Sequence, residues 1–229
     1  MLHINAKLDR FSDGESSWEQ YSIPLNSNLH QFLEHSLAQS KLQMQEIVRR
    51  IQRALIIWQI CHMDALMPIS QIVFIYGKCI TIKKNIEKFK TFPTKKRESE
   101  KMIKLWQELE PFIKQLHTTI EQLETSVSSI QEALDMAYNM IAVPGMTGII
   151  FYRSWTVHCF VEFLKTMIEK FNWELERKKL LEKRIVSTMD RNELRACRSF
   201  WQFLHDNEHY ESFHQLYKEF RREIQGKNC

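Results

Sequence analysis

The sequence predicts an all-α fold, an elongated antiparallel helical bundle or coiled coil of about five or six helices. Glycine and proline number only five each in 229 residues, whereas an all-β protein of this size needs many more turn residues. Long stretches also repeat apolar residues at alternating steps of three and four, which places them on one face of a helix. Apolar residues make up 44% and charged residues 26% of the chain, as in folded globular proteins.

The first 25 residues are polar with scattered aromatics, and we expect them to form a flexible N-terminal arm. Trp18 and Tyr21 either dock on the rest of the protein or stay exposed. Residues 26–229 are predicted to form a single helical bundle domain. Its first helix is capped by Asn26 or Ser27 and runs to about Met67, where Pro68 ends or bends it.

Residues 69–92 favour a helix, although they are rich in β-branched residues, because no other stretch offers a partner strand. The overlapping segment 78–104 holds ten lysines and arginines against three glutamates, a net local charge of +7. We expect it to form a surface loop between two helices. Within it, Lys95, Lys96 and Arg97 are candidates for nuclear import or for contact with an acidic partner.

The longest apolar repeat covers residues 99–142 and predicts a long bundle helix or coiled-coil seam. Pro111 requires either a bend or a new helix start within it. The glycine- and proline-containing loop 143–148 then lets the chain fold back antiparallel. Twelve residues form this long seam: Met102, Leu105, Leu109, Phe112, Leu116, Ile120, Leu123, Val127, Ile130, Leu134, Ala137 and Ile141.

The next predicted helix covers 154–186, with Ser154 as its N-cap. Six apolar residues at steps of four and three form its buried face: Val157, Val161, Leu164, Ile168, Phe171 and Leu175. The C-terminal helices are predicted within 191–224. Asp190 is expected to cap the first of them, which ends near His205, and Asp206 or Asn207 the second.

No signature of catalysis, of cofactor binding or of metal binding occurs in the sequence, so we predict no enzyme activity and no cofactor. His205, His209 and His214 come nearest to a metal cluster. They lack companion ligands at zinc spacing and are expected to be solvated surface histidines. The five cysteines form no CxxC pair, which favours a reducing compartment.

The most apolar window, Ala54–Tyr76, predicts a buried core rather than a membrane span, because it includes His62, Asp64 and Gln71. Direct binding to nucleic acid is not expected either. No aromatic residues are placed to stack on single-stranded bases, and glutamates interleave the basic residues of 177–184.

Short motifs between residues 151 and 212 carry a resemblance to a known family. They are Phe151 with Ser154-Trp155; Phe160 or Phe163 around Glu162; Glu174-Leu175 with Lys178-Lys179-Leu180-Leu181 and Lys183-Arg184-Ile185-Val186; and Trp201, Leu204-His205 and Tyr210-Glu211-Ser212. They resemble the C-terminal region of the cyclin-dependent kinase 2-interacting protein family. The leucine-rich stretch Leu109–Leu134 is similar to the coiled coil of that family, whereas Thr156 stands where the family has proline.

The resemblance implies a non-enzymatic, nuclear helical adaptor, with a cytoplasmic pool also compatible. Its implied partners are cyclin-dependent kinase, the checkpoint kinase adaptor, the replication machinery and an AAA+ ATPase complex that acts at replisomes and in ribosome maturation. The helix 154–186 would then be a docking surface, although aromatic residues in it could equally be ordinary core. The candidate docking residues are Trp155, Phe160, Phe163, Trp173, Lys178, Lys179, Lys183 and Arg184.

The alternative function is a structural coiled-coil component of a cytoskeletal or centrosomal assembly. Such a protein shares the long seam but needs neither the basic segment 78–104 nor the aromatic C-terminal third. The sequence leaves open the identity of the partner, the oligomeric state, and whether kinase binding is retained. It also leaves open whether the long seam pairs within one chain or between chains, as a homo- or hetero-oligomer.

Overall fold

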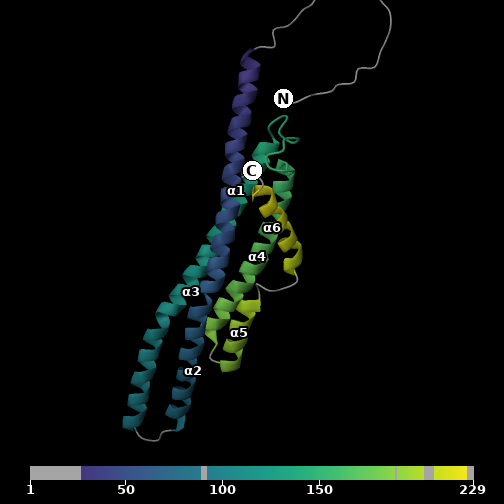
Figure 1. The fold of residues 1–229 in the computed structure, drawn as a ribbon. Coiled ribbons are helices and arrows are strands. Elements are labelled where there is room, and N and C mark those ends of the chain that lie inside the picture. Colours follow the sequence, from purple (N-terminus) through teal and green to yellow (C-terminus); the bar gives the residue numbers. More distant parts are fainter. Residues whose placement is uncertain (1–26, 89–91, 189, 204–208, 226–229) are drawn as a thin grey trace, which may run out of the picture. The chain divides into compact units, whose positions relative to one another are not determined.

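The computed structural model describes residues 27–88, 92–188, 190–203 and 209–225, with side chains from residue 35 onward, apart from 92 and 209–213. These ranges contain helices and no strand, which confirms the all-α class. The chain divides into two units, Met1–Gln39 and Ser40–Cys229, and the predicted arm of 1–25 lies outside the described residues. The helices are α1 (Ser27–Asp64), α2 (Leu66–Lys88), α3 (Phe92–Ile141), α4 (Val157–Ser187), α5 (Arg191–Phe203) and α6 (His209–Gln225) (Figure 1).

Only Ala65 separates α1 from α2, so the first helix ends slightly earlier than predicted. Pro68 lies in the first turn of α2, where proline is tolerated. The Ala65 N–H donates to Cys61 O at 3.2 Å, and the Ile69 N–H donates to Ala65 O at 3.1 Å. These bonds continue the helical pattern across the junction, so both helices share one periodicity.

The helical prediction for 69–92 is confirmed as far as Lys88. The expected surface loop over 78–104 is wrong, because α2 reaches Lys88 and α3 already begins at Phe92. Lysine and arginine are good helix formers, and Ile82 and Met102 pack against the core from this segment. The nine described cations of this segment therefore lie on α2 and α3 rather than on a loop.

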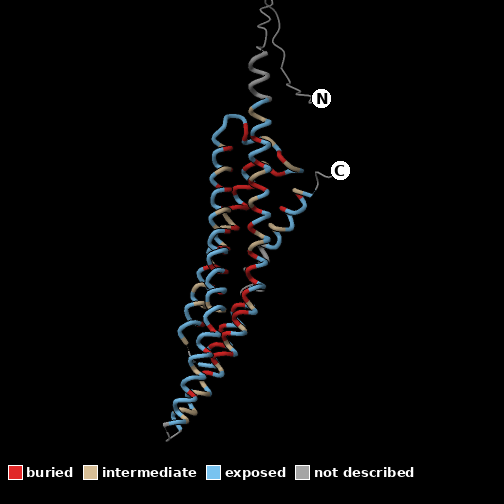
Figure 2. The backbone as a smooth tube through the Cα atoms, turned by 90° about the vertical axis from the view of Figure 1, so that its left-hand side faces the viewer, coloured by how far each residue is buried: buried red, intermediate tan, exposed pale blue. Residues whose placement is uncertain are grey.

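Helix α3 packs against both α2 and α4 within the second unit. All twelve residues of the predicted long seam are buried or half-buried, and Figure 2 shows buried residues along the facing sides of the helices. The contacts of α3 with α4 run in opposite chain order, since His117 meets Glu182 and Glu124 meets Lys179. The long seam is thus covered within the chain. Pro111 lies inside α3 without ending it.

Helix α4 begins at Val157, after Thr156 in extended backbone, so the prediction of Ser154 as its N-cap is wrong. Ser154 instead donates to a carboxylate of α6, described below. The backbone before the helix folds on itself: the Phe151 N–H donates to Trp155 O at 3.1 Å, next to the bridge between Ile150 and Thr156. Five of the six predicted core residues of α4 are buried, and Ile168 is half-buried.

The prediction of Asp190 as a helix cap is confirmed. Its Oδ1 accepts from the N–H groups of Asn192 and Glu193, both at 2.8 Å. Helix α5 then ends at Phe203 and packs on α2 and α4, whereas α6 packs on α4 (Figure 1). The predicted caps Asp206 and Asn207 lie outside the described residues.

Candidate functional site: a basic groove between three helices

A surface groove of about 850 Å³ lies between α2, α3 and α5. Six of its lining side chains are cationic and two are carboxylates, Glu98 and Glu108, which gives a net charge of +4. The cations come from all three helices: Lys78 from α2, Lys101 and Lys104 from α3, and Arg191, Arg195 and Arg198 from α5. The groove therefore offers several separate donors to an anionic ligand.

The arginines of the groove follow from the periodicity of α5. They are spaced by four and three residues, which places them on one helix face. The opposite face is buried and consists of Leu194, Cys197 and Trp201. Burial of that apolar face against α2 and α4 fixes the arginine face outward.

Gly77 of α2 lies beside Arg191 of α5. A Cβ atom at this position would lie 3.9 Å from Nε of Arg191 and near no other atom. The Arg191 guanidinium therefore extends over the α2 backbone, where it forms one wall of the groove.

The groove also has an apolar part. Phe74 is 58% exposed, and Nζ of Lys78 lies 4.2 Å from the centroid of its ring, within reach of a cation–π contact. Leu105 is buried below, and Val73 and Ile82 are half-buried beside it. Glu98 is paired with Lys101. A ligand that carries both carboxylates and apolar groups would match this lining.

A second polar cluster is buried between α1, α4 and α5. Nζ of Lys178 lies 3.0 Å from Oε1 of Glu174 and 2.9 Å from Nδ1 of His62, and 4.2 Å from the ring centroid of Trp201. The Trp201 indole N–H donates to His62 O at 3.2 Å. Lys178 and Glu174 are fully buried and His62 is 3% exposed. The cluster therefore joins three helices and is closed to a ligand from solvent.

Burial lowers the pKa of Lys178, while the Glu174 carboxylate acts in the opposite direction. Burial likewise lowers the pKa of Lys170 to about 8, again against the effect of Glu174. The pKa of the nearby Cys61 thiol is raised, chiefly by burial and further by Asp64. Cys61 Sγ donates to Gln122 Oε1 at 3.3 Å, so this thiol is protonated and unreactive at neutral pH.

The predicted anchors Trp155, Phe160 and Phe163 lie in the core rather than on an exposed docking face. They surround Phe220 of α6, whose ring stacks on Phe163 with centroids 4.9 Å apart. Beside them, Glu223 accepts from the Ser154 N–H at 2.8 Å, the Trp155 N–H at 3.2 Å and the Ser154 hydroxyl at 2.6 Å. Burial would raise the pKa of Glu223, but these three donors lower it overall.

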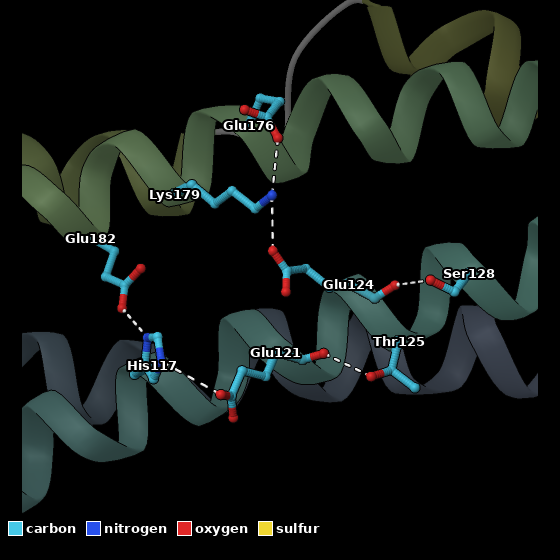
Figure 3. A network of polar contacts seen from close by, with 8 residues as sticks. All are labelled: His117, Glu121, Glu124, Thr125, Ser128, Glu176, Lys179 and Glu182. Carbon is cyan, nitrogen blue, oxygen red and sulfur yellow. Dashed lines mark hydrogen bonds and ion pairs between the residues drawn. The ribbon is translucent and has the colours of Figure 1, made fainter.

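The other predicted docking residues of α4 do not join this aromatic cluster. Lys178 is buried, Trp173 is half-buried with Cζ of Arg177 3.5 Å from its ring centroid, and Lys183 and Arg184 are exposed. Lys179 pairs with Glu124 of α3 at 2.8 Å and with Glu176 at 3.1 Å (Figure 3). The predicted docking face is thus divided between the core, an interhelical ion pair and solvent.

Lys95, Lys96 and Arg97 are exposed in the first turns of α3, outside the groove lining. The side chains of His205 and His209 lie outside the described residues, and His214 is exposed. Within the part of the chain that is described, no group of three or more His, Cys, Asp or Glu residues could hold a metal ion. Cys61, Cys79 and Cys197 are buried free thiols, and Cys159 is an exposed one.

One helical stretch, His35–Lys88, is long and apolar enough to cross a membrane by length and composition alone. Of its most apolar window, 39% is buried inside the protein. Core helices of soluble proteins can have the same length and apolar composition. The buried side of this stretch belongs to the core described above.

The groove was not foreseen from the sequence as a site. The spacing of Arg191, Arg195 and Arg198 was visible, but their position opposite Lys78 depends on tertiary packing. No protein-family model matches the chain, and no curated protein matches it in sequence. The resemblance to the cyclin-dependent kinase 2-interacting protein family stays a prediction from its motifs.

Proposed function

We propose that this protein is a non-enzymatic helical adaptor, or a subunit of a protein complex, that binds an acidic protein partner through the groove between α2, α3 and α5. One observation carries the proposal: three helices each contribute cations to one groove, around the exposed ring of Phe74. Arginine and aromatic residues dominate the binding energy of protein interfaces.

A protein partner fits the groove better than nucleic acid does. A nucleic acid presents a regular row of closely spaced phosphates, whereas apolar side chains and the carboxylates Glu98 and Glu108 interrupt the cations of this lining. An acidic protein segment supplies both carboxylates for the arginines and apolar groups for Phe74. Complementary charge also accelerates encounter with such a partner.

The family resemblance suggests where the adaptor acts. On that basis we propose a nuclear complex, either an AAA+ ATPase assembly at replisomes and in ribosome maturation or one that contains cyclin-dependent kinase. An elongated antiparallel bundle would hold such partners apart along its length. The exposed Lys183 and Arg184 of α4 remain candidates for a second contact, as do Lys95, Lys96 and Arg97 for nuclear import.

The test is affinity purification of the tagged protein at endogenous level, followed by mass spectrometry. The groove variant carries Arg195→Glu with Arg198→Glu, two exposed positions on α5. The matched control carries Lys114→Glu with Lys218→Glu, exposed positions outside the groove with the same change in charge. We expect the groove variant to lose its main partners at least tenfold and the control to keep them.

Three other results would contradict the proposal. If both variants keep their partners at the wild-type level, the groove is not the docking site. If both lose them equally, overall charge rather than the groove decides binding. If only cytoskeletal or centrosomal proteins co-purify, the structural coiled-coil alternative replaces the adaptor. Circular dichroism of each purified variant shows that its fold is kept.

A further inference from the structure

A line of exposed apolar side chains runs along α1 and α2 on the side away from the core. Each is more than half exposed, between 52% and 58%, although each is large and apolar. We call these five residues the exposed stripe: Ile56, Ile60, Met63, Met67 and Phe74.

The spacing of the exposed stripe is that of a coiled-coil seam. Its steps are four, three, four and seven residues, and a seam repeats at three and four. The hydrogen bonds of Ala65 and Ile69 keep the helical pattern across the junction between α1 and α2, so the stripe continues on one face. At a rise of 1.5 Å per residue it extends over about 27 Å, or about five helical turns.

The opposite face of α1 and α2 packs in the core of the protein. Trp58, Cys61, Ala65, Ile69 and Ile72 are at most 3% exposed and belong to the core. The exposed stripe is therefore a second seam, and nothing in the described part of the chain covers it.

Both ends of the exposed stripe are cationic. Arg49 and Arg53, both exposed, precede Ile56 by seven and three residues and continue its spacing. At the other end, Phe74 and the following Lys78 line the basic groove. The carboxylates on this surface are Glu46, 3.6 Å from Arg49, the exposed Asp64, and the groove residues Glu98 and Glu108.

We propose that the exposed stripe and the basic groove together bind one amphipathic helix of a protein partner. The apolar face of this partner helix spans about five turns. Carboxylates of the partner helix follow its apolar face at the end that enters the groove. The inference rests on the proposed function and adds the conformation and the sequence pattern of the bound segment. Helices of this kind dock through apolar residues at i, i+3, i+4 and i+7.

The width and the charge pattern of the surface favour a helix over other ligands. Gln59, Asp64 and Gln71 are exposed beside the stripe, and a membrane would have to desolvate them. Residues 54–77 contain no lysine or arginine, so this stretch offers the phosphates of a nucleic acid no cation of its own. A narrow apolar line with cationic ends matches an apolar helix face with acidic ends.

The test places the photo-cross-linker p-benzoylphenylalanine at Met63 in the full-length chain in cells. The control places it at Leu180 of α4, which is 59% exposed and outside the stripe. We expect the cross-linker at Met63 to capture a peptide of a partner protein. That partner should be one that no longer binds the groove variant. That peptide should show apolar residues at i, i+3, i+4 and i+7 beside glutamate or aspartate.

A synthetic peptide of the cross-linked segment then tests affinity. We expect Ile60→Asp with Met63→Asp to weaken binding of the full-length protein to this peptide at least tenfold, and Leu180→Asp to leave it unchanged. All three positions are exposed, so each variant should keep its unfolding midpoint. The peptide should gain helical circular dichroism on binding to the wild type.

Several outcomes would overturn the inference. Cross-links to lipid, to a second copy of this chain, or to residues 1–26 of the same chain would each assign the stripe to a different occupant. A cross-linked peptide without the apolar and acidic pattern would reject the helix. If Arg195→Glu with Arg198→Glu abolishes partner binding while the stripe variant keeps wild-type affinity, the inference falls and the proposed function stands. If neither variant changes binding, both fall.

Discussion

Lys178 is fully buried, and lysine is almost never buried without a partner. It follows Leu175 by three residues, so it falls on the apolar face of α4, and the sequence already placed Glu174 one helical turn before it. Glu174 and His62 hold its ammonium at 3.0 and 2.9 Å. Burial opposes the charge and Glu174 supports it, so the fold of this region depends on keeping the pair together.

We predict that Lys178→Met lowers the free energy of unfolding by about 3–5 kcal/mol, because it removes the ammonium that lies 3.0 Å from the buried Glu174 carboxylate. Urea denaturation measures the loss. The double variant Glu174→Leu with Lys178→Met removes both charges and should recover at least half of it. Equal stability of wild type and Lys178→Met would show that the ion pair contributes nothing.

At the scale of helices, periodicity predicted most of what the structure contains. The long seam of α3 and the apolar face of α4 are buried as expected, because a repeat of three and four can bury its residues only as a helix. The basic loop was predicted wrongly, because charge density alone does not separate a solvated helix from a loop. Ser154 was misassigned because its actual partner, Glu223, lies 69 residues away.

The groove and the buried aromatic cluster could not be derived from the sequence, because both depend on how separate helices pack together. Periodicity states which residues share a face but not which face meets which helix. From the sequence, Trp155, Phe160 and Phe163 could either contact a partner protein or belong to the core. In the structure they are buried, and Phe220 of α6 packs against them. The arginines of α5 line a groove only because α5 packs against α2.

The contact between α3 and α4 should depend on pH through His117. Its Nδ1 lies 3.0 Å from Oε1 of Glu182, and its Nε2 lies 3.4 Å from Oε1 of Glu121 (Figure 3). The hydrogen bond and the charge of Glu182, followed by the charge of Glu121, raise the pKa of His117 above 6.5. Protonated His117 therefore stabilises the folded state fully below pH 6.5. This stabilisation is lost as the pH rises through the folded-state pKa of His117.

NMR titration of the His117 ring measures this pKa directly. We expect a value above 6.5 in the wild type and a return toward 6.5 in Glu182→Gln, whereas the distant Glu219→Gln should leave it unchanged. A wild-type value at or below 6.5 would mean that the histidine does not hold α3 to α4 in solution.

Gly77 offers a stabilising substitution within α2. Glycine in a helix interior costs about 0.5–1 kcal/mol relative to alanine. The added Cβ would meet only Nε of Arg191 at 3.9 Å, an ordinary van der Waals contact. We expect Gly77→Ala to raise the free energy of unfolding by about 0.5–1 kcal/mol in urea denaturation. Destabilisation would indicate that α5 lies closer to α2 than described.

For the whole molecule, the groove and the exposed stripe join a cluster of charge to a line of exposed apolar side chains. The groove has a net charge of +4, equal to the formal net charge of the entire chain. The exposed stripe adds five large apolar side chains that lead into the groove. This combination does not stabilise the fold of the chain itself. Exposed apolar patches of this kind are typical of interaction surfaces.

The division of the chain at Gln39 predicts that residues 40–229 fold independently. Among the described residues, the buried apolar core begins at Met44, so removal of 1–39 deletes none of it. We expect the 40–229 fragment to keep its unfolding free energy within about 1 kcal/mol, with the usual small effect of a change outside the core. Thermal and urea unfolding of both proteins measure the difference.

A deeper truncation to residues 52–229 is the control. It removes Met44, Ile47, Val48 and Ile51, which are at most 6% exposed. Loss of several buried apolar side chains should destabilise this fragment by at least about 4 kcal/mol, because the core surface that they cover becomes exposed to water. If the 40–229 fragment were destabilised to the same degree, the first 39 residues would belong to the same cooperative unit as the core.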